Sequence, residues 1–324
     1  MKKLILILPV LTGIMWGSVG TFIRKLTEFG ADTFTILAIR TLIAILLLMA
    51  ALLLFNKELL KIKLRDSWIF LACGILGTFS LNVCYTEAIN QLSLSLAAVL
   101  LSLSPVYVVI IAGMFLHEKI TSRKLFCMVL AIAGCSLVSG LFESGGFSWS
   151  LSGVFFGVLA GFFCGLYSVF SKVATDRKYS PVTVTFYSMV FAFTASAPFA
   201  EWNIIGSFVQ AAPAGNSLFL IACSVMTIIL PYVLFTYAIN HGEAGKTTII
   251  SSASEPSSAM IFGIIFFAEM PTLLSITGLV VTVIALALLC REDDTLYHQY
   301  SQNQREPAIE NHRFSFYNAF NRFS

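Results

Sequence analysis

The feature that most constrains this chain is a series of apolar segments, each about as long as a lipid bilayer is thick. A hydrocarbon core of about 30 Å is crossed by about 20 helical residues. Backbone groups that face lipid must be satisfied within their own segment, so segments of this length indicate helices rather than barrel strands. We expect ten spans: residues 4–23, 35–55, 67–89, 94–115, 124–142, 151–172, 182–200, 216–239, 247–267 and 274–290.

Composition agrees with this pattern. Hydrophobic residues make up 57% of the 324 residues, charged residues make up 11%, and the mean hydropathy is +0.86. These values lie outside the range of soluble globular proteins. The sequence therefore predicts an all-α integral membrane protein with ten transmembrane helices.

Lysine and arginine are distributed unevenly between the connecting segments. If the amino terminus is cytoplasmic, the inner connections hold most of these residues, and the outer connections hold only Arg24 and Lys25. This bias orients membrane proteins by the positive-inside rule. We expect a multi-pass protein of the plasma membrane with both termini in the cytoplasm.

The chain contains an internal repeat. Segment 104–121 aligns with segment 255–272 at an offset of 151 positions, which pairs Pro105 with Pro256, Glu118 with Glu269, and Thr121 with Thr272. Recurrence of these residues at one spacing indicates two related halves of five spans each. Because five is odd, the second half enters the membrane from the opposite side. Such inverted repeats occur in secondary transporters, which bind substrate between the repeats.

This division gives a first repeat at residues 1–142, a second at 151–290, and a polar tail at 291–324. The tail changes abruptly to polar residues with scattered aromatic ones, so it has too few apolar residues for a core. We expect it to be a disordered cytoplasmic segment.

These motifs also resemble those of a known family. Gly13-x-x-Trp16-Gly17, Arg40 early in the second span, and a Pro-to-Glu-x-x-Thr ending on the fourth and ninth spans are similar to the EamA-domain branch of the drug/metabolite transporter superfamily. The resemblance covers about residues 4–290. The second copy departs from the pattern at Glu255 and Pro271. The resemblance implies a carrier of a metabolite or an amino acid, commonly an exporter, and it leaves the cargo open.

Glu255 is the main candidate for a functional residue. A carboxylate inside a span costs about 3 kcal/mol on insertion scales, so such residues usually face a cavity or a partner. Ser251, Glu255 and Ser258 stand four and three positions apart and form one polar face of a helix. Pro256 is expected to break the helical bonding and present polar backbone to a cavity.

Two functional roles and one structural role are open to Glu255. It can pair with an ammonium group of the substrate, or it can take up and release a proton that drives export, because desolvation raises a carboxyl pKa. Alternatively, it is a neutral acid that is hydrogen-bonded to a neighbouring helix for packing. Sequence does not separate these roles.

Further candidates for the cavity are Asn82, Tyr85, Glu87, Trp16 and Arg40. Asn82 and Tyr85 lie at helical spacing on one face of the third span. Glu87 stands near the outer end of that span, at an entrance or at the wet interface. Arg40 either extends its side chain outward to water or serves as a counter-ion for Glu87 or for a substrate carboxylate. Trp16 either lines the cavity or packs in the core.

Several function classes find no support. The chain has no H-E-x-x-H or G-x-S-x-G motif, and its four histidines lie outside the apolar spans. Its seven cysteines form no C-x-x-C pair. We therefore expect no catalysis, metal, cofactor or nucleic acid, and the alternatives are an intramembrane enzyme and a non-transporting scaffold. With Arg40 the one cation clearly within a span, polyanionic substrates are disfavoured, and a neutral, zwitterionic or cationic metabolite fits better.

Overall fold

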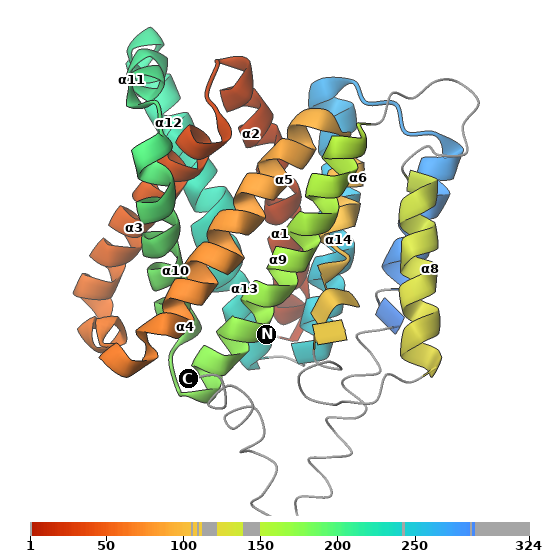
Figure 1. The fold of residues 1–324 in the computed structure, drawn as a ribbon, viewed down its shortest axis with the longest axis horizontal. Coiled ribbons are helices and arrows are strands. Elements are labelled where there is room, and N and C mark those ends of the chain that lie inside the picture. The colour runs from red at the N-terminus through yellow and green to blue at the C-terminus, as the bar shows by residue number, and fades with distance from the viewer. Residues whose placement is uncertain are drawn as a thin grey trace, which may run out of the picture.

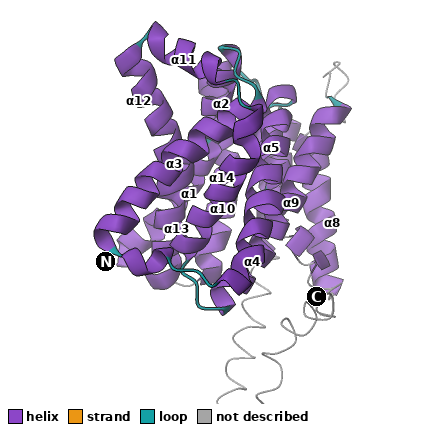
Figure 2. Cartoon of the chain, turned by 60° about the vertical axis from the view of Figure 1, so that its left-hand side comes forward, coloured by secondary structure: helices purple, strands orange, loops and turns teal. Residues whose placement is uncertain are grey.

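The computed structural model describes residues 2–104, 106–108, 110–111, 122–138, 150–241, 244–285 and 287–288. Within these ranges every regular element is helical, as the sequence predicts (Figures 1 and 2). Six helices are long and apolar enough to cross a membrane, and four shorter apolar helices accompany them. Together they fall on the ten expected spans. The tail at 291–324 lies outside the described residues, as do Pro105 and Glu118.

The first half begins with α1 (Lys2–Gly17), α2 (Val19–Glu28) and α3 (Thr33–Phe55). Short turns η1 (Lys57–Leu60) and η2 (Leu64–Asp66) lead to the third span, which consists of α4 (Ser67–Ala72), η3 (Cys73–Phe79) and α5 (Ser80–Gln91). α6 (Leu94–Leu101) and α8 (Ser122–Val138) follow. A left-handed Gly30 (φ 98°) lies in the turn between α2 and α3.

The second half begins with α9 (Leu151–Asp176), α10 (Pro181–Ser196) and the turn η4 (Ala197–Phe199). α11 (Trp202–Ala211) lies across the upper end (Figure 2). The eighth span is α12 (Pro213–Ser224), η5 (Val225–Ile229) and α13 (Leu230–His241). α14 (Ala244–Phe267) and a helix over Leu273–Ala285 end the described chain.

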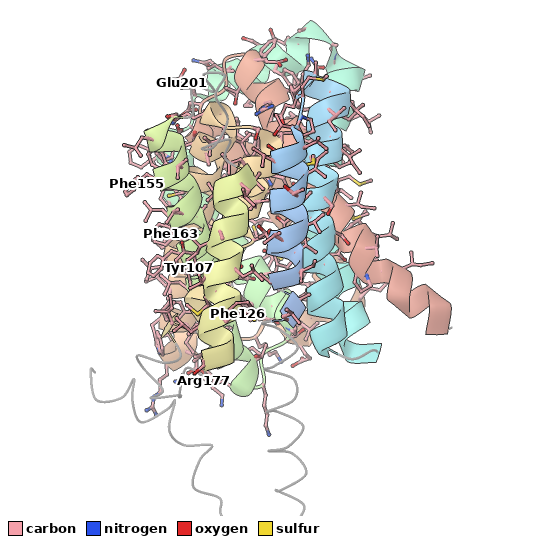
Figure 3. The ribbon with its side chains drawn as sticks, turned by 90° about the vertical axis from the view of Figure 1, so that its right-hand side faces the viewer. Tyr107, Phe126, Phe155, Phe163, Arg177 and Glu201 are labelled. Atoms are coloured by element: carbon pink, nitrogen blue, oxygen red, sulfur yellow. The ribbon has the colours of Figure 1, made fainter. Side chains whose placement is uncertain are left out.

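The first helices of the two halves run in opposite directions. α1 is parallel to α14, because Pro9 meets Ser251 and Gly13 meets Ser258. α9 is antiparallel to the third span, because Gly153 approaches Gln91 near the start of α9 and Arg177, just after its end, meets Asp66. In Figure 1 α1 leads up to α2, and Figure 3 labels Arg177 at the lower end, so α1 runs upward and α9 downward. The two halves are thus inverted relative to each other, as the odd number of spans predicts.

Corresponding contacts recur in the two halves. Phe22 of α2 packs on Phe219 of α12, with ring centroids 5.2 Å apart. A similar contact joins Phe170 of α9 to Trp68 of α4, with ring centroids 6.5 Å apart. These pairs join the first span of one half to the third span of the other. The third span of each half also contains a π-helical segment at the same place, namely η3 and η5. Each contact crosses between the halves, so a site in this region is built from both.

A polar network ties the two halves together at the lower end of the molecule, where Figure 3 labels Arg177. Asp66 pairs with Arg177 and accepts a hydrogen bond from the Tyr179 hydroxyl at 2.7 Å. The guanidinium of Arg177 also lies over the Trp68 ring, 5.6 Å from its centroid. Burial, followed by the nearby Asp66 carboxylate, raises the pKa of Tyr179 above its ordinary value, so its hydroxyl remains a donor at neutral pH.

Close contact between α1 and α14 depends on two glycines. A Cβ atom on Gly13 would lie 2.7 Å from the Ser251 carbonyl oxygen, and one on Gly17 would lie 2.7 Å from the Glu255 carbonyl oxygen. Small residues allow two helix backbones to approach in this way inside a membrane. The Gly-x-x-Trp-Gly pattern of the first span is therefore explained by packing against the helix that carries Glu255.

One expectation about α14 is wrong. Pro256 was expected to break the helix, whereas α14 continues from Ala244 to Phe267 with Pro256 buried inside it. Proline is tolerated inside transmembrane helices when neighbouring helices pack around the freed backbone. In α14 the neighbouring α1 lies against this part of the helix, as the Gly17 contact shows. The helix is thus not broken at Pro256, although proline has no N–H to donate to the Ser252 carbonyl.

Candidate functional site

Glu255 lies in the middle of α14, and its side chain is partly exposed. In the described part of the chain, its carboxylate takes part in no hydrogen bond and no ion pair. A buried acid that served packing would be hydrogen-bonded to a neighbouring helix. Such a contact is absent among the described residues, which leaves the carboxylate available to a ligand or a proton.

Ser251 and Ser258 do not share the surroundings of Glu255. Ser251 is 1% exposed and donates to the Pro9 carbonyl at 3.1 Å. Ser258 is 6% exposed and donates to the Gly13 carbonyl, also at 3.1 Å. Both hydroxyls are occupied by backbone of α1. The polar face expected on α14 is therefore divided, because its two serines contribute to helix packing while Glu255 remains unpaired.

Arg40 is buried rather than directed outward to water. Its side chain is 3% exposed, and Nη2 donates to Oγ1 of Thr227 in η5 at 2.9 Å. Its Nε atom has no hydrogen-bond partner among the described residues. Arg40 also approaches Cys223, which lies just before η5. The side chain thus extends from the second span of the first half to the third span of the second half.

Aromatic rings connect the surroundings of Arg40 to those of Glu255. Tyr232 follows η5 by one turn and meets the edge of Trp16, with centroids 5.8 Å apart. Trp16 stands on α1 between the two glycines that contact the backbone of α14 at Glu255. Tyr167 of α9 also meets Tyr232, with ring centroids 6.5 Å apart. Trp16 therefore belongs to an aromatic wall contributed by both halves.

Tyr85 lies within range of both charges. It is 6% exposed, and the charges of Glu255 and Arg40 both act on it. Both charges also act on Tyr232. Glu255 and Arg40 do not form an ion pair with each other. We call Arg40, Glu255, Tyr85, Tyr232 and Trp16 the central site.

Asn82 and Glu87 have local partners. Asn82 donates from Nδ2 to the Thr78 carbonyl at 2.7 Å, within the region where η3 disturbs the regular helical bonding. Glu87 accepts a short hydrogen bond from the Thr33 hydroxyl. It is therefore not the counter-ion of Arg40 in this structure. These contacts bring neither Asn82 nor Glu87 to Arg40 or Glu255.

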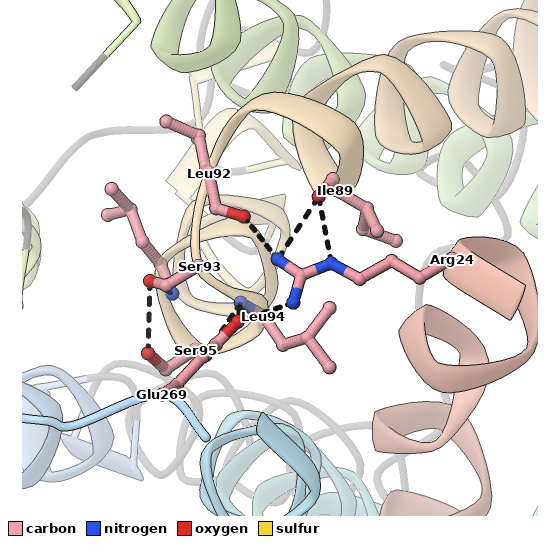
Figure 4. A network of polar contacts seen from close by, with 8 residues as sticks. Arg24, Ile89, Leu92, Ser93, Leu94, Ser95 and Glu269 are labelled. Atoms are coloured by element: carbon pink, nitrogen blue, oxygen red, sulfur yellow. Dashed lines mark hydrogen bonds and ion pairs between the residues drawn. The ribbon is translucent and has the colours of Figure 1, made fainter. Parts of the chain in front are cut away.

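Glu269 belongs to a second polar network, at the upper end (Figure 4). It forms an ion pair with Arg24 at 2.7 Å and accepts hydrogen bonds from the backbone N–H of Leu94 at 2.9 and 3.1 Å. Arg24 donates in addition to the carbonyls of Ile89 and Leu92. A carboxylate at a helix N-terminus is favoured by the helix dipole, so Glu269 stabilises the start of α6. The network joins α2, α5, α6 and the segment after α14.

Sequence reasoning missed the partners Arg24, Tyr232 and Thr227. Arg24 was interpreted as a charge in an outer connection, and neither Tyr232 nor Thr227 stands out from its apolar neighbours. The internal repeat gives no signal for Thr227, because the matching position in the first half is Gly77. Their roles arise from contacts between residues that are far apart in the chain.

Known proteins that are similar to this chain are described as transporters. The profile of the EamA-like transporter family matches residues 3–140 and again residues 151–291. A protein of Archaeoglobus fulgidus described as an uncharacterized transporter is 25% identical over 87% of this chain and 95% of its own length. The pseudopaline exporter of Pseudomonas aeruginosa is 28% identical over 67% of this chain and 73% of its own length. A solved crystal structure shares the fold with a TM-score of 0.57, at 16% identity, over 90% of this chain and 98% of that chain.

Proposed function

Because the chain belongs to the EamA-like transporter family, we propose that it is a secondary transporter, which exports a small metabolite such as an amino acid or an amine by alternating access. The observation that carries this proposal is the Glu255 carboxylate on α14, which has no partner among the described residues and lies on a helix packed against the α1 segment that carries Trp16. Ionisable residues inside a membrane span mark substrate or ion pathways. Sites between inverted repeats become accessible to each side in turn as one part moves against the other.

Charge distribution supports an orientation. The connection between α3 and α4, which carries Lys57, Lys61, Lys63 and Arg65, lies at the lower end of Figure 1, whereas α2, which carries Arg24 and Lys25, lies at the upper end. By the positive-inside rule the lower end faces the cytoplasm, and the protein resides in the cytoplasmic membrane. Both termini are then cytoplasmic.

The Arg24–Glu269 network bears on the transport cycle. In this structure it ties four segments together at the end that we assign to the outside. Opening toward the outside has to separate some of these groups, so the network favours the outward-closed state. Release of a substrate to the outside therefore competes with re-formation of the Arg24–Glu269 pair. The name of the pseudopaline exporter, one of the relatives, supports export as the direction.

Coupling to protons is the second part of the proposal. A carboxylate without a partner in a low-dielectric region is the group whose protonation is most easily linked to a change of conformation. Glu255 would then alternate between a protonated and a charged form as the site changes sides. An enzyme is the weaker alternative, since the named relatives are transporters.

Transport by the purified protein tests this function directly. Liposomes that contain the protein are loaded with amino acids and amines, and release is followed with and without an imposed proton gradient. We expect at least one compound to leave more than about tenfold faster than from protein-free liposomes, since a carrier replaces the cost of desolvating the solute in lipid. We also expect the gradient to change the rate. The proposal is contradicted if no compound moves under any condition.

A further inference from the structure

Arg40 is a buried cation that has no acidic partner among the described residues. Its guanidinium is buried within the membrane region, where it donates a hydrogen bond to one neutral hydroxyl, that of Thr227. Its Nε atom has no partner among the described residues. Cations within membrane spans almost always pair with an anion or with several carbonyls. A buried guanidinium that lacks an acidic partner is a ready binding site for a carboxylate, which it contacts with two parallel hydrogen bonds.

Comparison of the two halves shows that this cation is not required by the fold. The position equivalent to Arg40 in the second half is Ser188 of α10. Ser188 approaches Cys73 beside η3, as Arg40 approaches Cys223 beside η5. The same contact between a second span and the opposite third span is thus made by a serine in one case and by an arginine in the other. The arginine adds a charge to one side of an otherwise symmetric arrangement.

Glu255 is the complementary case. It is an acidic residue without a partner among the described residues, and its counterpart in the first half is Ser104. Each half therefore contributes one unpaired charge at a position where the other half has a serine. The two charges have opposite sign, and contacts connect their surroundings. Arg40 binds Thr227, which lies five residues before Tyr232, and Tyr232 packs on Trp16 of α1. The glycines on either side of Trp16 contact the backbone of α14 at Glu255. They do not neutralise each other by direct contact.

We propose that the central site binds a zwitterion, whose carboxylate contacts the Arg40 guanidinium and whose ammonium group contacts the Glu255 carboxylate. This inference rests on the proposed transport function and names the substrate class of the same site. A zwitterion satisfies both charges at once, whereas an amine leaves the Arg40 guanidinium unpaired and an acid leaves Glu255 unpaired. Leaving one member of a buried charge pair without a partner is strongly unfavourable.

The aromatic wall fits this ligand. Trp16 meets Tyr232 edge to face, and Tyr232 meets Tyr167 at a similar angle, so the wall offers both ring faces and tyrosine hydroxyl groups. An ammonium group is attracted by aromatic faces, in particular that of tryptophan. Tyrosine hydroxyls can donate to a carboxylate. The rings therefore add contacts for both ends of a zwitterion without adding charge.

The test uses three matched probes with the same side chain. A panel of amino acids is first screened by the shift in melting temperature of the purified protein in lipid nanodiscs. The amino acid with the largest shift is then compared with the amine that lacks its carboxylate and with the acid that lacks its amino group. We expect the zwitterion to bind more than tenfold more tightly than either analogue.

Substitutions separate the two contacts. Arg40→Gln is expected to weaken binding of the zwitterion more than tenfold and to leave binding of the amine within twofold. Glu255→Gln is expected to weaken binding of the amine and of the zwitterion but not that of the acid. Arg40→Lys keeps the positive charge, so it controls for a failure of Arg40→Gln to fold. We expect Arg40→Lys to retain part of the preference for the zwitterion over the two analogues. Arg65→Gln, at an exposed arginine, is the matched control.

The outcomes distinguish this inference from the transport proposal. If the zwitterion binds with the expected preference and is not carried by liposomes, the inference stands and the transport function fails. If the amine or the acid binds as tightly as the zwitterion, or if Arg40→Gln keeps the preference for the zwitterion, the inference is overturned, even where transport is observed. It is equally overturned if none of the amino acids shifts the melting temperature.

Discussion

Replacement of Glu255 by glutamine is expected to abolish transport while the protein stays folded. Glutamine keeps the shape of the side chain and its capacity for hydrogen bonds, but it removes the charge and the titratable proton. Loss of a buried charge contact costs about 2–5 kcal/mol, which corresponds to a fall in the transport rate of about 30-fold or more. Because the carboxylate has no partner among the described residues, its removal should not lower the melting temperature.

The combination of these two readouts decides between function and packing. If Glu255 were a neutral acid that only held two helices together, Glu255→Gln would transport as fast as the unmodified protein. In that case Glu255→Leu would lower the melting temperature, because leucine cannot form the hydrogen bond. Glu28→Gln provides the matched control, because Glu28 is exposed at the end of α2. Transport by Glu255→Gln at the level of Glu28→Gln would be incompatible with a role for this carboxylate in the cycle.

Replacement of Gly17 by valine is expected to prevent correct folding. The first carbon of the new side chain would lie 2.7 Å from the Glu255 carbonyl oxygen, and α1 and α14 would have to separate. Overpacking of this kind costs about 1–3 kcal/mol, and more where backbone rather than a flexible side chain is displaced. The hydrogen bond from Ser258 to α1 would be lost at the same time. We expect a large fall in the yield of monodisperse protein and a melting temperature lower by several degrees.

Gly215→Val is the matched substitution at a place with free space. No heavy atom of another segment lies within 4 Å of the Cβ position at Gly215, near the start of α12. It should leave the yield and the melting temperature close to those of the unmodified protein. If Gly17→Val behaves in the same way, the close contact between α1 and α14 described above is wrong.

The fold could be predicted from sequence because its main determinants are local. The length of an apolar segment fixes whether it can cross a bilayer, and the internal repeat, with an odd number of spans in each half, fixes their relative direction. The ten apolar helices and the antiparallel relation of α1 and α9 therefore follow from the order of residues alone. The π-helical segments η3 and η5 could not be predicted, since neither contains a proline or a charge that marks it.

The site was predicted less completely, because the hydrogen-bond partner of a polar side chain depends on which helix packs against it. Ser251 and Ser258 share a helix face with Glu255 by spacing, yet the close approach of α1 turns their hydroxyls into packing contacts. Arg40 was open to an outward orientation, and the structure directs it inward to Thr227 instead. Glu269 was found through the repeat, whereas its partner Arg24 is 245 residues away in the chain.

The central claim is that one site, shared by two inverted halves, is reached from each face of the membrane in turn. Cys164 of α9 reports on it, since this thiol is partly exposed and Glu255 is among the charges that act on it. A variant that keeps Cys164 and lacks the other six of the seven cysteines is treated with a small membrane-impermeant thiol reagent, in vesicles of each orientation. We predict labelling from both faces, slowed on both by the transported compound. Labelling confined to one face under every condition, or absent from both, would contradict the account.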